Sequence, residues 1–199
     1  MGRLRVGKNF TIDTPDEIPS VTNALRRALG AKDLRLSTQA VGPQAIQTVI
    51  STGAMIDDTD GGSIVPFATF GEWRYFLSAA FDFNIKAGVA SFKSASMTIW
   101  RSALVTAAPM RILRAEWEVR RDAHAQPHWH VYLAEVEKSA SQGATRSRSI
   151  ERFHLAMAAE WCTGSASHYR DPTASNVASW VYYCLVYSRS QLESISRRS

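Results

Sequence analysis

The chain has 199 residues, of which 45% are hydrophobic, and it carries a net charge of +5. This length and composition favour one globular unit with a single core, and they exclude a disordered chain. No apolar run approaches the roughly 20 residues of a membrane span, so no membrane is expected as a partner, whereas the basic excess is compatible with a polyanion.

The first 65 residues are rich in turn formers, and we interpret them as an accessory region of unknown role that precedes a domain at residues 66–199. One helix is predicted at residues 20–30, because Ser20 suits an N-cap and Gly30 suits a helix end. The aspartates at positions 57, 58 and 60 are interpreted as a solvated turn, since the later glutamate of a calcium loop is missing. The N-terminus has no apolar secretory block, and Cys162 and Cys184 lack metal-ligand spacing, which indicates a cytoplasmic protein.

The central part of the chain changes its hydrophobic period. Residues 71–81 and 91–105 place apolar side chains at helical spacing, which predicts two helices. After residue 109 the period becomes two, and residues 110–121 and 128–137 are predicted to form a β-hairpin. Beyond it we expect a helix at 150–161, a short strand at 165–172 and a helix at 175–190.

The hairpin predicts a metal site. His128 and His130 share one face of their strand, and Trp129 lies on the other, which we expect to face the core. In the partner strand Glu116 and Glu118 also share a face, and both glutamates lie beside both histidines if the apolar faces meet one core. Such nitrogen and oxygen ligands suit manganese, magnesium or zinc with positions open for a substrate oxygen.

Two choices remain open at this site. Glu118 is the preferred third ligand because it is nearer to the turn, and His124 is the alternative if the turn folds back over the metal. The competing interpretation is that these residues form only the solvated face of an amphipathic hairpin. All five histidines fall between positions 124 and 168, which favours the metal site.

Residues 120–133 resemble the HUH motif of single-strand DNA endonucleases, in which two histidines flank a bulky apolar residue. They look closest to the Pro-His-Trp-His form in the replication gene A proteins of tailed phages, which also tend to carry residues like Asp122 and His124 before the motif. The similarity covers roughly residues 95–190. It implies an α/β (α+β) domain with a central antiparallel sheet flanked by helices, which nicks and joins single-stranded DNA in rolling-circle replication with divalent manganese or magnesium.

The same resemblance assigns a nucleophile. Tyr183 and Tyr187 are four residues apart, hence on one helical face, and they match the family's tyrosine pair, which forms a 5′-phosphotyrosine intermediate. Tyr182 points away from that face. The family usually has lysine at the position of Val186, so this chain departs from the pattern and its activity is in doubt. A packed aromatic stripe that includes Trp180 is the competing interpretation.

The remaining hypotheses concern contacts and rival functions. Six arginines are candidate contacts to the DNA backbone: Arg120, Arg121, Arg146, Arg148, Arg152 and Arg189. One rival function is a catalytically weakened, nucleic-acid-binding protein of the same fold. The other is an unrelated metalloprotein with histidine ligands. The sequence predicts no oligomeric state.

Overall fold

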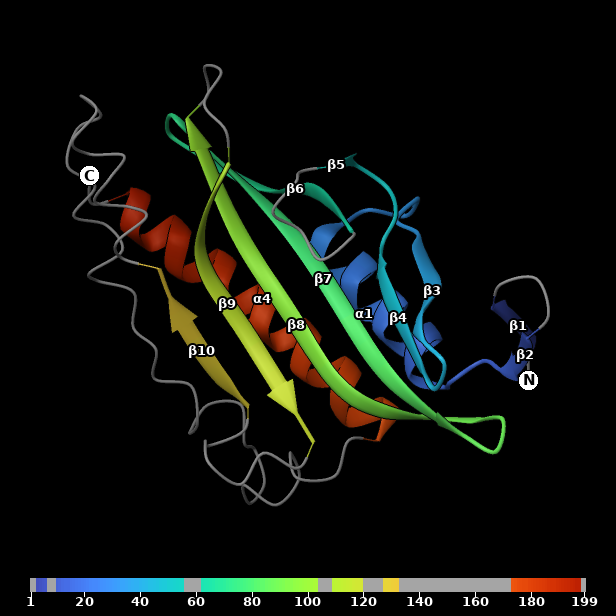
Figure 1. The fold of residues 1–199 in the computed structure, drawn as a ribbon. Coiled ribbons are helices and arrows are strands. Elements are labelled where there is room, and N and C mark those ends of the chain that lie inside the picture. The colour runs from blue at the N-terminus through green and yellow to red at the C-terminus, as the bar shows by residue number, and fades with distance from the viewer. Residues whose placement is uncertain are drawn as a thin grey trace.

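The computed structural model describes residues 3–6, 10–55, 62–103, 109–119, 127–132 and 173–197, and Figure 1 shows their arrangement. In chain order the elements are β1 (Arg3–Val6), β2 (Phe10–Asp13), α1 (Glu17–Leu29), β3 (Leu36–Gly42), β4 (Ala45–Ile50), β5 (Ala54–Met55), β6 (Ser63–Phe70), β7 (Trp73–Lys86), β8 (Val89–Ala103), β9 (Met110–Glu118), β10 (His128–Val131) and α4 (Ala174–Ser196).

The strands form an antiparallel sheet with the order β10-β9-β8-β7-β4-β3. Strand β6 pairs with the first part of β7, the two-residue β5 extends β6, and β1 and β2 form a separate ribbon. The long hairpin of β7 and β8 runs diagonally through the sheet (Figure 1). The expected α+β class with a central antiparallel sheet is therefore confirmed.

The two helices predicted at residues 71–81 and 91–105 are wrong, because these residues form β7 and β8. In β7 the buried side chains Tyr75, Leu77 and Phe81 alternate with less buried ones, as the period of a strand requires. The positions between them include Ser78, which is small and only weakly polar, and Ala80, which is small and apolar. The polar half of the alternation is therefore faint in the sequence, and helical spacing fits the same apolar residues.

Three other predicted elements are confirmed. Strands β9 and β10 form the hairpin, with β9 ending at Glu118 and β10 beginning at His128. Helix α1 begins three residues before the predicted start and ends at Gly30, whose φ of 67° is the left-handed conformation that favours glycine. Helix α4 includes the predicted 175–190 and continues to Ser196. The elements expected at 150–161 and 165–172, and the acidic turn at 57–60, lie outside the described residues.

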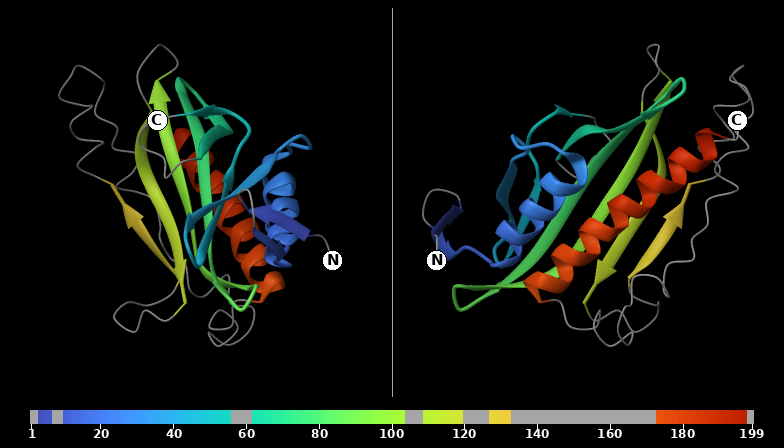
Figure 2. Two further views of the ribbon diagram at one scale, coloured as in Figure 1. Left: turned by 45° about the vertical axis from the view of Figure 1, so that its right-hand side comes forward. Right: turned by 180° about the vertical axis from the view of Figure 1, so that it is seen from behind.

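Both described helices pack on one face of the sheet, as the view from behind shows (Figure 2). We call this the helix face; it is formed by side chains such as Leu77, Phe81 and Trp117, which share one buried cluster with α1 and α4. Strands β3 and β4 and helix α1 belong to the same sheet and core as the later strands, and the boundary expected after residue 65 falls inside β6. The first 65 residues thus supply part of this core.

Aromatic contacts hold α4 against β9. The rings of Trp117 and Trp180 meet edge to face with centroids 5.7 Å apart, and Phe92 contacts Trp117 at 6.0 Å. Both tryptophans are almost fully buried, and burial beside them raises the pKa of the Cys184 thiol. Of the helices that the structure describes, neither has the length and apolar character that crossing a membrane requires.

Trp180→Ala tests this packing. It removes a fully buried indole, and we expect the free energy of unfolding to fall by about 3–5 kcal/mol, measured by urea denaturation. Val186→Ala is the control on the same helix, because Val186 is exposed and its truncation should change stability by less than about 0.5 kcal/mol. Equal losses in the two variants would contradict the placement of α4.

Candidate functional site

The sheet face opposite the helices, here called the outer face, carries polar side chains in register across the strands. One row runs through Val49, Ala80, Ser96, Glu116 and His128. The next runs through Ser78, Thr98, Arg114 and His130. Directly paired residues of antiparallel strands lie on the same face, so the register places both histidine positions beside glutamate and arginine.

Glu116 is the centre of the contacts on this face. Its Oε2 atom lies 2.8 Å from Nε2 of His130, and its Oε1 atom lies 2.6 Å from Nη2 of Arg114. The side chain of Glu116 is 14% exposed, whereas that of His130 is 47% exposed. The carboxylate is thus held in place between a cation and an imidazole that faces solvent.

This geometry fits a divalent cation. His130 Nε2 and Glu116 Oε2 form a hydrogen bond of 2.8 Å. Neighbouring ligand atoms that bind one metal ion at about 2.0–2.2 Å lie roughly 3 Å apart, so an ion that replaces the shared proton requires little movement of either side chain. The backbone of His128 is directly across from Glu116. Among the side chains that the structure describes, no three His, Cys, Asp or Glu residues already form a cluster.

Among the histidines that the structure describes, His130 contacts Glu116; Glu118, the preferred third ligand, stays a prediction. The register pairs His128 with Glu116; continued one step on this face, it would bring Glu118 opposite position 126, before β10 begins. Glu118 instead pairs with Ser94 on β8. The alternative ligand, His124, lies outside the described residues.

Sequence reasoning missed several polar residues of the outer face. Asp82 accepts hydrogen bonds from Gln47 at 3.0 Å and from Ser94 at 2.8 Å, at one end of the face. At the other end the Arg111 guanidinium lies 5.0 Å from the Tyr132 ring centre and next to Trp100. The sequence signal that indicates an outer face is the alternation of β9, in which polar residues at 114, 116 and 118 lie between buried ones.

The tyrosine pair lies on the other side of the sheet. Trp180 of α4 contacts Trp117 on the helix face, and Trp117 alternates along β9 with Glu116, which contacts His130 on the outer face. The structure therefore does not bring Tyr183 or Tyr187 together with His130, because the sheet lies between them.

The environments of these tyrosines are those of a helix surface. Tyr183 is 50% exposed, and its ring contacts Tyr182, which in turn lies under the guanidinium of Arg27 from α1. Tyr187 packs partly buried against the core. Val186 is exposed on the same helix. Of the three aromatic residues in the competing interpretation, Trp180 is buried and Tyr187 is partly buried, whereas Tyr183 is exposed.

Arg189 has a structural role in place of the expected contact to DNA. Its guanidinium donates hydrogen bonds to the carbonyl oxygen of Ala28 at 3.2 Å and to that of Phe67 at 2.6 Å. It thereby joins the end of α1 to β6 and α4, with its donors directed into the protein. The other five candidate arginines, Arg120, Arg121, Arg146, Arg148 and Arg152, lie outside the described residues.

Comparison of this chain with protein-family models, curated proteins and solved structures finds no match. The interpretation of the outer face therefore depends on its own geometry and chemistry.

Manganese titration tests the metal site. Because His130 and Glu116 present adjacent donor atoms, His130→Ala and Glu116→Gln should each weaken manganese binding at least about tenfold in calorimetry. Glu193→Gln is the matched control, since Glu193 is also paired with an arginine, Arg197, but lies on α4. Unchanged affinity in both outer-face variants would remove the site from consideration.

Proposed function

We propose that this chain is a metal-dependent endonuclease of single-stranded DNA that acts at the outer face of the sheet, related in its metal half to the HUH endonucleases. The observation that carries the proposal is the contact of His130 with Glu116 at 2.8 Å, next to the cationic side chain of Arg114. The resemblance of residues 120–133 to the HUH motif supports the same substrate and metal.

In this proposal, different residues of the outer face have different roles in phosphodiester cleavage. His130, His128 and Glu116 would hold manganese or magnesium, which when bound polarises a phosphate oxygen. Arg114 orients the Glu116 carboxylate through their ion pair of 2.6 Å. Arg111, fixed beside two aromatic rings, supplies positive charge for the DNA backbone.

The finer hypothesis is nicking and joining in rolling-circle replication through a 5′-phosphotyrosine. Its assigned nucleophiles, Tyr183 and Tyr187, lie beyond the sheet from His130, so this step requires a tyrosine from elsewhere. Tyr132 follows β10 on the side of the sheet where Arg111 contacts its ring. Among the described tyrosines, Tyr132 is therefore the candidate nucleophile to test against Tyr183 and Tyr187.

Cleavage of labelled oligonucleotides tests the proposal. With manganese, the protein should cut a pool of single-stranded oligonucleotides and leave the same sequences intact as duplexes. Glu116→Gln should lower the cleavage rate at least about 100-fold, because the charge stabilisation by the ion is worth several kcal/mol. Glu193→Gln serves again as the control that should retain the rate of the unmodified protein.

A denaturing gel then identifies the nucleophile. Cleavage without a covalent protein–DNA adduct would support hydrolysis and exclude the phosphotyrosine step. An adduct that is lost in Tyr132→Phe would assign the nucleophile to the outer face, whereas loss in Tyr183→Phe or Tyr187→Phe would restore the helix pair. Binding of DNA without any cleavage would favour a nucleic-acid-binding regulator, and manganese binding without DNA binding would favour a metalloprotein of another kind.

A further inference from the structure

The outer face holds a small cavity beside the His130 and Glu116 contact. Its volume is about 40 Å³. Ligand pockets for molecules of drug size have volumes of roughly 300–1,000 Å³, so a nucleobase or larger molecule does not fit inside. A water-sized group needs about 10–15 Å³ by the same measure, so the cavity has room for about three such groups, which accommodates the two non-bridging oxygen atoms of a phosphodiester.

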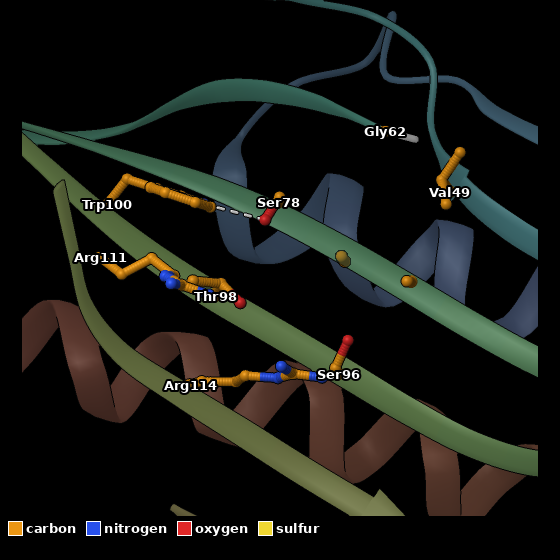
Figure 3. Close-up of a pocket in the computed structure, with 10 residues that line it drawn as sticks. Val49, Gly62, Ser78, Ser96, Thr98, Trp100, Arg111 and Arg114 are labelled. Carbon is orange, nitrogen blue, oxygen red and sulfur yellow. Dashed lines mark hydrogen bonds between the residues drawn. The ribbon is translucent and has the colours of Figure 1, made fainter. Parts of the chain in front are cut away.

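Two guanidinium groups line this cavity. Arg111 and Arg114 both extend from β9 across β8, the first toward Thr98 and the second toward Ser96 (Figure 3). The ring of Trp100, 2% exposed, and the ring of Tyr132 flank the Arg111 guanidinium. Aromatic faces attract a guanidinium, so the two rings hold the Arg111 guanidinium at the wall of the cavity.

Hydroxyl groups line the floor of the cavity. Ser78, Ser96 and Thr98 all contribute to its wall. The indole N–H of Trp100 donates to Oγ of Ser78 at 2.9 Å (Figure 3), so this oxygen serves as the acceptor and its own proton can be donated elsewhere. A concave wall of hydroxyl donors beneath two guanidinium forks favours an oxyanion with several acceptor oxygens.

The carboxylate of Glu116, which contacts the lining residue Arg114, is already compensated. Glu116 has one carboxylate oxygen on Arg114 and the other on His130. An anion in the cavity therefore meets this carboxylate as part of an ion pair. The Nε atom of Arg114 is buried without a hydrogen-bond partner within the described part of the chain. A buried donor of this kind gains stability when it acquires an acceptor.

We propose that this cavity is a phosphate subsite, in which Arg111, Arg114 and the hydroxyl groups of Ser78, Ser96 and Thr98 bind one tetrahedral phosphate group. That this phosphate belongs to a DNA backbone rests on the proposed function; binding of the phosphate group itself does not. The subsite lies next to the candidate metal ligands, because Arg114 contacts Glu116. A backbone held there places the neighbouring phosphodiester near His130.

Titration of the metal-free full-length protein with inorganic phosphate tests the subsite. In EDTA and at constant ionic strength, phosphate should shift the NMR signals of the arginine side-chain N–H groups saturably, and chloride should not. Arg111→Gln should weaken phosphate binding at least about tenfold, the effect of one lost charge-assisted hydrogen bond. Arg27→Gln is the matched control, because Arg27 lies on α1 beside Tyr182, and it should bind phosphate unchanged.

A second pair of variants separates loss of binding from loss of folding. Thr98→Val keeps the side-chain volume but removes a hydroxyl donor, and Arg111→Lys keeps the charge but loses the planar fork. Both should weaken phosphate binding while thermal unfolding shows a folded protein. Signals that do not respond to phosphate, or that respond equally in Arg111→Gln, would overturn the subsite.

Binding of a single-stranded oligonucleotide in EDTA identifies the source of the phosphate. If Arg111→Gln weakens binding of both inorganic phosphate and the oligonucleotide, the subsite holds a DNA backbone. If it weakens only the binding of inorganic phosphate, the assignment to DNA is overturned and the ligand is another phosphate compound. Since these measurements use no metal and no cleavage, phosphate binding that persists without manganese-dependent cutting would count against the proposed function alone.

Discussion

The contact between Trp117 and Trp180 determines which side of the sheet is core and which is surface. It places α4 on one face of β9, and the alternation of a strand then directs Glu116 and Arg114 to the opposite face. The strand register extends the same two faces to β8 and β10. Because Trp117 faces the core, Glu116 faces the other side of the sheet, where it contacts His130. A hydrophobic contact on one face of the sheet thereby fixes the positions of the polar side chains on the opposite face.

The sequence predicted elements well where neighbouring positions differ strongly in polarity. The β9–β10 hairpin was recognisable because Glu116, Trp117 and Glu118 alternate between extremes. The strands β7 and β8 were mistaken for helices because serine and alanine occupy many outward positions, and such residues suit either period. Trp100 adds to the ambiguity, since it is an apolar residue on the outer face whose indole N–H is satisfied by Ser78.

The alternation of side chains along a strand predicts only which residues of the candidate site share a face. The shared face of the histidines follows from the sequence, whereas the pairing of Glu116 with position 128 depends on register, which the length and shape of the connection determine. The side of the sheet on which α4 lies is a property of the whole core. Spacing shows that Tyr183 and Tyr187 share one side of a helix, but it does not show which way that helix faces.

The bond from Arg189 to Ala28 joins residues 161 positions apart in the chain. Helix α1 packs extensively on α4, so α1 completes this packing only after nearly all of the other described residues have been synthesised. Until then the apolar surfaces of α1 and of the sheet stay exposed to other chains. Such long-range closure makes folding slow and prone to aggregation. Newly made chains should therefore depend on chaperones more than the size of the protein alone would suggest.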